Sequence, residues 1–431
     1  MATAASPAVP AAATAHACYL SGVISGFTHR DFDAVRGVLE KQLGHHRGGA
    51  SITVIHQGTV VADLWGGVRD AHGAPWTADT LALSFSTTKG VASTLLHVLA
   101  SQGRIDYDQR VAHYWPAFAQ GGKQSITVRQ LLSHQAALWN IRDLIDDAAQ
   151  MRDWHGMVER MERAQPAHAP DGRTGYHGLT FGWLIGGLVE QVTKRPFARV
   201  LEDELTAPLG LDGCFVGAPG SVLDRRATLL GVRPSSGKAP SLRRRLGERA
   251  LRIAWQSVHA LAGTDPDAFK RALLPRGIQH FDWNAPATAA ACMPAASGMF
   301  TSRSLARIYA LLAEGGALDG VRLLAPEVLT QASHVQTRVR DDVLMLRMGW
   351  RLGYHGVRLG GRHAFGHFGF GGSGAYCDPS RRLAVAMTLN SGVGTPLGDL
   401  RMLRLARAVV RAADQHRPRT VSTAPRAATG A

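Results

Sequence analysis

Cysteine is scarce in this chain of 431 residues, and none of its four cysteines lies near another. They are Cys18, Cys214, Cys292 and Cys377. Without a C-x-x-C pair, the sequence predicts neither a zinc site nor a disulfide framework. Reduced thiols in a cytoplasmic protein are the expectation.

Long apolar runs are also missing. The longest run, near Phe181 to Val189, is far too short to span a bilayer. The alanine-rich segment from Met1 to Ala17 lacks the basic start and the leucine-rich stretch of a secretion signal. We therefore expect a soluble, cytoplasmic protein with no membrane span.

Arginine supplies nearly all of the basic residues, and the formal net charge is +15. The arginines are scattered, apart from a local cluster at Arg243, Arg244, Arg245, Arg249 and Arg252. No nucleic-acid recognition motif accompanies them, so we predict no nucleic-acid partner. A composition of 45% hydrophobic and 19% charged residues indicates a globular protein with a large core.

Two catalytic signatures are absent. There is no G-x-S-x-G, which excludes the nucleophile elbow of the α/β-hydrolases. There is no H-E-x-x-H either, which excludes the commonest zinc-protease helix.

Elements of similar type occur at both ends of the chain. A helix pattern at Phe32 to Leu43 is followed by two short strands within Ser51 to Leu64. Late in the chain, an apolar hairpin at Ala375 to Leu389 is followed by a helix at Leu397 to Ala412. The stretch between them, roughly 90–290, is mainly helical. We predict an α+β fold in which one antiparallel sheet is built from both termini, with a cleft between the sheet and the helices.

The predicted domains follow from this layout. Residues 18–90 and 291–414 form the sheet domain, and 91–290 form an inserted all-helical domain. Residues 1–17 and the tail at 415–431 are predicted to be disordered.

Ser86 and Lys89 form an S-x-x-K motif where a loop enters a helix that Gly103 ends. Positions i and i+3 of a helix are neighbours, so the two side chains share a face. A desolvated lysine can act as the base that activates a serine hydroxyl. The unsatisfied N–H groups of a helix N-terminus also suit a developing oxyanion.

The motif alone is weak evidence. A second copy, Ser235 to Lys238, lies among prolines and is interpreted as a solvated loop. By itself, Ser86 could equally be an ordinary N-cap followed by a surface lysine. The surrounding sequence has to distinguish a catalytic serine from an ordinary N-cap.

The segment from Leu83 to Trp139 resembles the serine β-lactamase family, in the branch of class C β-lactamases, DD-peptidases and family VIII carboxylesterases. The resemblance rests on five blocks in the right order, and only the ends and 220–290 fall outside it. These blocks are S-F-S-T-T-K-G-V-A-S-T with its extension to Trp139, then Tyr176 to Leu188, Pro208 to Leu211, Ala295 to Leu312, and His367 to Asn390. The family implies a five-stranded antiparallel sheet flanked by terminal helices, an all-helical domain, no metal and no cofactor.

Tyr176 matches the tyrosine of the family's Tyr-x-Asn element, which acts as the acid/base partner of the serine. The resemblance implies that its phenolate is stabilised by Lys89. A packed core tyrosine is the alternative. The chain departs from the pattern at Gly178, where the family has an asparagine that helps to hold the acylamide group of β-lactams. This departure weakens a β-lactamase function and favours ester hydrolysis.

His367 and Gly369 match the family's Lys-Thr-Gly element on the strand that edges the cleft. The resemblance implies that the N–H of Phe370 pairs with the N–H of Ser86 as an oxyanion hole. His367 would steady the Lys89 and Tyr176 pair or contact substrate, unless it is an ordinary buried histidine.

The glycines from Gly369 to Gly374 also fit G-x-G-x-x-G. They lead into a strand and not a helix, which excludes a dinucleotide site. Trp139 and Asn140 are predicted to line the acyl pocket, with a core tryptophan as the alternative.

The sequence therefore predicts a serine hydrolase that acts through an acyl-enzyme on a small-molecule substrate, a carboxylic ester of short to medium chain. The first alternative is a β-lactamase or DD-peptidase. The second is a non-catalytic binding protein on the same fold. The acyl and alcohol preferences, the oligomeric state and the pathway stay open.

Overall fold

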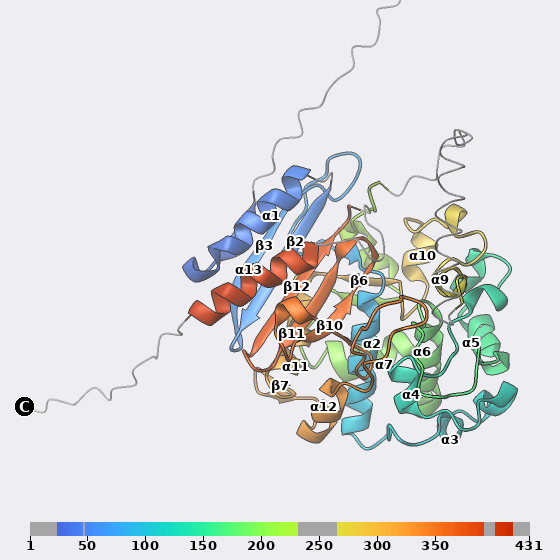
Figure 1. Cartoon of the computed structure of the whole chain (residues 1–431). Helices are drawn as coiled ribbons and strands as arrows, with labels where there is room; N and C mark the ends of the chain where they lie inside the picture. The colour runs from blue at the N-terminus through green and yellow to red at the C-terminus, as the bar shows by residue number, and fades with distance from the viewer. Residues whose placement is uncertain (1–23, 46–47, 232–264, 392–400, 417–431) are drawn as a thin grey trace, which may run out of the picture.

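The structure is a computed structural model that describes residues 24–45, 48–231, 265–391 and 401–416 (Figure 1). The predicted disorder at 1–17, most of the predicted tail, the second S-x-x-K copy and the arginine cluster near 243–252 lie outside these ranges.

The centre of the molecule is an antiparallel sheet of seven strands in the order β1-β3-β2-β12-β11-β10-β9. It joins strands from both ends of the chain, as the sequence predicted. The strands, in that order, are Ser25–Thr28, Thr59–Gly67, Gly49–His56, Leu383–Leu389, Gly374–Asp378, Phe365–Phe368 and His355–Gly356.

The predicted number of five strands is wrong, although the five expected strands form the uninterrupted run from β3 to β10. The two additional strands, β1 and β9, lie at the edges. β1 has four residues and is mostly exposed, and β9 has two. Neither is long enough to show the alternation of apolar and polar residues by which a strand is recognised.

The β2–β3 hairpin forms where the sequence predicted it, with its turn at Gln57 and Gly58. Both residues have positive φ, 51° and 76°. A two-residue turn with positive φ at both positions matches the right-handed twist of the strands that it joins. Glycine adopts such a φ without steric cost, which is why the Gln-Gly pair ends β2.

Alternating residue sizes along β12 explain how helices cover both faces of the sheet. The large side chains Leu383, Val385 and Met387 belong to the core beneath α1 and α13 (Asp33–His45 and Arg401–Gln415). Ala384 and Ala386 belong to the core on the opposite face, where α11 (Ser302–Ala313) packs. Every residue of β12 is buried, as expected for a strand covered on both sides.

Figure 1 shows α1 and α13 across the sheet and the helices α3 to α7 gathered beyond β10. A small sheet, β4-β6-β5, connects the two regions, and its strand β5 lies within the segment predicted to be all-helical. The remaining helices are α2 (Thr87–Ser101), α3 (Val111–Tyr114), α4 (Val128–Leu132), α5 (Trp154–Arg163), α6 (Thr180–Thr193), α7 (Phe197–Leu201), α9 (Ala268–Leu273), α10 (Pro286–Ala290) and α12 (Pro326–Ser333). The remaining strands are β4 (Ala82–Leu83), β5 (Cys214–Val216), β6 (Gly298–Phe300), β7 (Ala317–Leu318) and β8 (Val321–Arg322).

Helix α2 lies between the sheet and the helical region. It contacts α6 on one side and β10 on another. Every residue of the helix from Thr87 to Leu99 is buried. Gly90 allows this close packing, because a Cβ there would lie 2.1 Å from the hydroxyl oxygen of Tyr309.

The predictions about the cysteines and about a membrane crossing concern the described residues. Cys214, Cys292 and Cys377 are free thiols. Among the described helices, none combines the length and the hydropathy that a membrane crossing requires.

Two glycine substitutions test this packing. Gly37 lies within α1 and a Cβ there meets nothing within 4 Å, so Gly37→Ala should stabilise the fold by about 1 kcal/mol.

Gly366 in β10 has no room for a Cβ, because that atom would lie 2.1 Å from the carbonyl oxygen of Ala375. Gly366→Ala should therefore destabilise the protein. Thermal unfolding of both variants measures this, and an unchanged Tm for Gly366→Ala would contradict the pairing of β10 with β11.

Candidate active site

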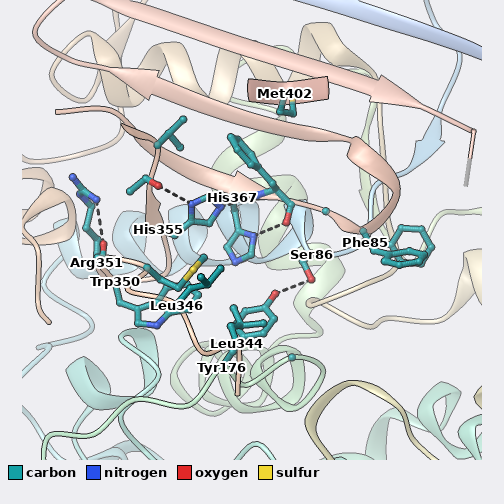
Figure 2. Close-up of a pocket in the computed structure, with 18 of the residues that line it drawn as sticks. Phe85, Ser86, Tyr176, Leu344, Leu346, Trp350, Arg351, His355, His367 and Met402 are labelled. Carbon is teal, nitrogen blue, oxygen red and sulfur yellow. Dashed lines mark hydrogen bonds between the residues drawn. The ribbon is translucent and has the colours of Figure 1, made fainter. Parts of the chain in front are cut away.

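Ser86 occupies the N-cap position of α2, but its hydroxyl makes no capping hydrogen bond. Its Oγ lies 3.0 Å from Nζ of Lys89 and 2.9 Å from the hydroxyl oxygen of Tyr176. Figure 2 shows Ser86 between Tyr176 and the strand that carries His367. The structure thus brings together the three residues that the sequence singled out, and the ordinary N-cap alternative does not describe Ser86.

The residue before the serine has an unusual backbone conformation. Phe85 has φ of 45°, in the left-handed region that costs a non-glycine residue about 1–3 kcal/mol. Its ring is held between Trp283 and Phe370, with centroids 5.0 and 5.5 Å away. Packing therefore fixes the sharp turn into α2, at which Ser86 is half-exposed while its neighbours are buried.

Lys89 is completely buried, and its amine has three polar neighbours. Nζ lies 2.6 Å from the carbonyl oxygen of Gly178 and 3.1 Å from that of Ala295, in addition to the hydroxyl of Ser86. The two carbonyls satisfy both N–H groups of a neutral amine. The lone pair of that amine is then available to the Ser86 hydroxyl.

Burial also lowers the pKa of Lys89 well below its ordinary value of 10.5. No carboxylate contributes to this shift, so desolvation acts unopposed. A second buried lysine, Lys123, is different: its Nζ donates to three carbonyl oxygens, which suits the charged form. Lys89 has the environment of a base and Lys123 that of a structural cation.

The structure corrects the expected charge state of Tyr176. The sequence implied a phenolate stabilised by Lys89, whereas burial raises the pKa of Tyr176 above its ordinary value of 10.0. The phenol is therefore neutral and donates a hydrogen bond to Ser86. Tyr176 is arranged as an acid, and the proton acceptor of the pair is Lys89.

Asp341 holds Tyr176 in place, and no sequence motif indicated it. This fully buried carboxylate accepts hydrogen bonds from the backbone N–H groups of Tyr176, Val343 and Leu344 and from the indole of Trp350. The Trp350 ring in turn stacks on the Tyr176 ring, with centroids 5.5 Å apart. Burial raises the pKa of Asp341 to about 6, while the four N–H donors oppose the rise.

Two buried histidines lie behind Tyr176. The backbone N–H of His177 donates to Nδ1 of His134, and that of Leu138 donates to Nε2 of His177. Each of these ring nitrogens is therefore an acceptor, which leaves the proton of His177 on Nδ1, 3.3 Å from Nδ1 of His134. Burial lowers the pKa of His177 to about 3, so this layer is neutral and fixes the loop around Tyr176.

The end of β10 approaches the N-terminus of α2 closely. A Cβ on Gly369 would lie 2.1 Å from the carbonyl oxygen of Ser84, so only glycine fits there. Among the described residues, neither the N–H of Ser86 nor that of Phe370 has a hydrogen-bond acceptor. Two donors without acceptors at the junction of β10 and α2 are what an oxyanion hole requires.

His367 of β10 is buried, and its ring lies beside that of Tyr176 with centroids 6.2 Å apart. Nδ1 pairs with the carbonyl oxygen of Phe368, while Nε2 has no partner among the described residues. Burial lowers the pKa of His367 well below 6.5. The ring therefore presents a neutral acceptor nitrogen within the site.

A cavity of about 1190 Å³ opens beside these groups, and Ser86, Tyr176, His367, Gly369 and Phe370 line it. Trp139 and Asn140 were predicted to line the pocket, but neither is among its lining residues. Trp139 is a core residue in the layer behind Tyr176, as the alternative interpretation held. Their position directly after a matched motif suggested a role that the path of the chain does not give them.

The position of the missing family asparagine is filled by another element. A Cβ on Gly178 would lie 2.3 Å from Cδ2 of Leu273 and 2.9 Å from the carbonyl oxygen of Ala272, both in α9. No larger side chain fits at 178 without moving α9. An apolar leucine therefore lies where a side chain at position 178 would begin.

One possible metal-binding group exists among the described residues. His29, Asp31 and His416 have ligand atoms within 4.8 Å of one another. They belong to the segments after β1 and after α13 and do not line the cavity. Nδ1 of His416 lies 2.9 Å from the Asp31 carboxylate, so these two groups already pair with each other.

Known proteins resemble the chain over most of its length. A family model described as Beta-lactamase matches residues 35–409. The esterase/beta-lactamase LipL of Mycobacterium tuberculosis is 36% identical over 355 residues, which cover 80% of this chain and 78% of that protein.

Solved structures of related proteins show the same similarity over most of the chain. A penicillin-binding protein homologue from Caulobacter crescentus is 33% identical with a TM-score of 0.77, and a family VIII carboxylesterase is 32% identical with a TM-score of 0.78. Each similarity covers 90% of this chain and 100% of the other chain. The fold and these relatives define the class of protein, a serine hydrolase. Within that class, the chain belongs to the beta-lactamase family.

The lowered pKa of Lys89 has a kinetic signature. With neutral Lys89 as the predicted base, kcat/KM is expected to fall only when the pH drops through the lowered pKa, and to reach its plateau well before pH 10.5. A lysine with an ordinary pKa would instead give a rise of about tenfold per pH unit up to that value. Initial rates with an ester substrate across the alkaline range distinguish the two cases.

The Asp341→Asn variant tests whether Asp341 holds Tyr176 in position. The amide keeps an oxygen for the backbone N–H groups but turns an NH₂ towards the indole of Trp350. We expect kcat to fall about tenfold with little change in KM, because Tyr176 loses its fixed position. A wild-type kcat in a folded variant would contradict this role.

The same variant has a predicted pH signature in its stability. The pKa of Asp341 is about 6 in the folded protein and 3.8 ordinarily, so unfolding releases a proton between these values. The wild type should therefore lose up to about 3 kcal/mol relative to the variant as pH rises from 3.8 to about 6, with no further change above. Unfolding of both proteins over this range measures the difference, and a constant difference would contradict the raised pKa.

Proposed function

We propose that the protein hydrolyses carboxylic esters of short to medium chain through an acyl-enzyme on Ser86. The observation that carries the proposal is the convergence of Lys89 and Tyr176 on one serine hydroxyl at the wall of a cavity. Nucleophile, base and acid are the three parts that acyl transfer requires.

In the acylation step, the neutral amine of Lys89 takes the proton of Ser86 as Oγ attacks the ester carbonyl. The carbonyl oxygen becomes an oxyanion that the N–H groups of Ser86 and Phe370 bind, a contribution of about 3–4 kcal/mol for each donor. The bond between the carbonyl carbon and the alcohol oxygen then breaks. The hydroxyl of Tyr176 gives its proton to the leaving alcohol, and the proton on Lys89 restores the phenol.

In the deacylation step, a water molecule attacks the acyl carbon of the Ser86 ester. The neutral amine of Lys89 accepts one proton of the water, and the second tetrahedral intermediate uses the same two N–H donors, while Tyr176 keeps its proton until Oγ leaves. When the bond to Oγ breaks, the carboxylic acid leaves and Oγ regains a proton. The atoms of one ester and one water are then present as one acid and one alcohol.

Gly178 and Leu273 favour esters over β-lactams and peptides. The amide that holds an acylamide group in the family is missing, and an apolar side chain lies in its place. An acylamide bound there would leave its polar atoms unpaired, a cost of about 1–3 kcal/mol for each group. The relative described as a family VIII carboxylesterase agrees with this preference, and LipL is described as both an esterase and a beta-lactamase.

The Ser86→Ala variant tests the proposal directly. Wild type and variant are assayed side by side with p-nitrophenyl esters of graded chain length and with nitrocefin, after folding is verified by Tm. Ser333→Ala, which removes an exposed hydroxyl from α12, is the matched control. We expect ester hydrolysis by the wild type and the control, a loss of at least about 10³-fold in Ser86→Ala, and slow nitrocefin turnover.

Three outcomes would count against the proposal. Ester turnover that survives in Ser86→Ala would remove Ser86 as nucleophile. Nitrocefin turnover faster than ester turnover would make the protein a β-lactamase. Failure of a fluorophosphonate probe to label the wild type would point to a binding protein that has kept the fold without the chemistry.

A further inference from the structure

The cavity beside Ser86 has two walls of different chemistry. One wall comes from the segment 269–283, namely α9 and the residues after it. It contributes only apolar side chains to the cavity, and no charged residue of this segment lines it. These side chains are Phe269, Leu273, Leu274, Ile278 and Trp283.

Another part of the lining, the cationic wall, carries arginine side chains in addition to apolar ones such as Leu346 and Met348. Arg338 and Arg347 come from the segment that leads to β9, and Arg358 and Arg362 come from the loop between β9 and β10. All four are exposed, and a fifth arginine, Arg351, is buried beneath them. No aspartate or glutamate is among the described residues that line the cavity.

The positive charge of this wall is uncompensated. The guanidinium groups of Arg338, Arg347, Arg358 and Arg362 have neither a hydrogen bond nor an ion pair with any described residue. Elsewhere arginines are regularly paired with carboxylates, as in the contact of 2.6 Å between Arg129 and Asp108. Arginines without such a partner among the described residues also occur elsewhere, for example Arg404 and Arg407 of α13, but those do not line the cavity. The feature specific to this wall is that four unpaired guanidinium groups line one site.

Two of these arginines, Arg338 and Arg351, are close enough for one charge to affect the other. The charge of Arg338 lowers the pKa of Arg351, in addition to the larger effect of burial. Like charges held together without a counterion raise the local concentration of anions and stabilise a bound one. Arginine suits this role, because its planar fork matches carboxylate, sulfonate and phosphate groups.

The position of Tyr176 relates the cationic wall to the reaction. Asp341 and Trp350, which hold Tyr176, belong to the same segment as Arg338 and Arg347. Figure 2 shows Trp350, Leu344 and Leu346 of this segment on the side of Tyr176. In the proposed mechanism Tyr176 protonates the leaving alcohol, so these arginines lie towards the alcohol portion of the ester. The apolar wall is then left for the acyl chain.

We propose that the natural substrate is an amphiphilic ester, with an apolar acyl chain against the 269–283 wall and an anionic group on its alcohol portion against the arginines. The anionic group is a carboxylate, a sulfonate or a phosphate. This inference rests on the proposed esterase function, and it specifies the substrate class of the same site.

Three chromogenic octanoyl-length esters test the inference. The first is neutral 4-nitrophenyl octanoate, and the second is 3-carboxy-4-nitrophenyl octanoate, which carries a carboxylate on the alcohol portion. The third is the mono-4-nitrophenyl ester of suberic acid, which carries its carboxylate at the far end of the acyl chain. At low ionic strength we expect kcat/KM for the second ester to exceed that for the other two by about tenfold. The excess should shrink as salt screens the charges.

A double variant, Arg338→Gln with Arg347→Gln, assigns the effect to the wall. We expect it to lower kcat/KM for the carboxy-substituted octanoate about tenfold, since two partly exposed ion pairs are lost, and to leave the neutral ester within about twofold. Arg411→Gln is the matched control, because Arg411 is an exposed arginine of α13 that does not line the cavity. It should change neither ester.

The inference fails if the neutral and carboxy-substituted octanoates are hydrolysed equally well. It also fails if the double variant lowers kcat/KM for the neutral and the carboxy-substituted octanoates by the same factor. A higher kcat/KM for the suberate ester than for the carboxy-substituted octanoate would contradict it as well. These outcomes leave the proposed function standing as long as the esters are hydrolysed and Ser86→Ala abolishes the reaction. Turnover that persists in Ser86→Ala would instead overturn the proposed function itself.

Discussion

The constraint on which the rest of the structure depends is the burial of one primary amine. Nζ of Lys89 lies between two carbonyl oxygens and one serine hydroxyl, with no carboxylate to stabilise its charge. Such an environment favours the neutral amine, whose lone pair then has a single partner. Residues Thr87 to Leu99 of α2 are buried around this amine, and this burial removes the lysine from water at a cost in free energy.

Segments that are distant in the sequence converge to create that environment. The carbonyls come from Gly178 and Ala295, the acid Tyr176 is held by Asp341, and the junction with β10 depends on Gly369. Each contact is local and simple, either a backbone hydrogen bond or a glycine where a Cβ would not fit. Together they pre-organise a site in which little has to move before a substrate carbonyl is attacked.

The sequence was sufficient where the signal is local. The hairpin at Gln57 and Gly58, the helix that begins after Ser86, and the group of Ser86, Lys89 and Tyr176 follow from short patterns and a family resemblance. It was insufficient where partners meet only in the folded chain. Asp341 follows an arginine in a stretch without a motif, and the unpaired state of Arg338 can be seen only once its neighbours are known.

The errors have the same physical origin. Trp139 and Asn140 were assigned to the pocket because they follow a matched block, but the chain turns them into the layer behind Tyr176. The charge of Tyr176 was inferred from its proximity to a cation, whereas desolvation neutralises both partners and leaves a phenol beside an amine. The family resemblance implied a sheet of five strands, and the sheet has seven, because the short edge strands β1 and β9 extend it.

The central claim is that Lys89 is uncharged in the resting enzyme, and NMR titration of lysine side chains tests it most directly. The chain has only six lysines, so the Cε and Nζ signals of labelled protein can be assigned with single variants, Lys89→Ala first. We predict that Lys89 gives the signal of a neutral amine well below pH 10.5, while the exposed Lys41 stays charged. A charged Lys89 that titrates together with Lys41 would contradict the account.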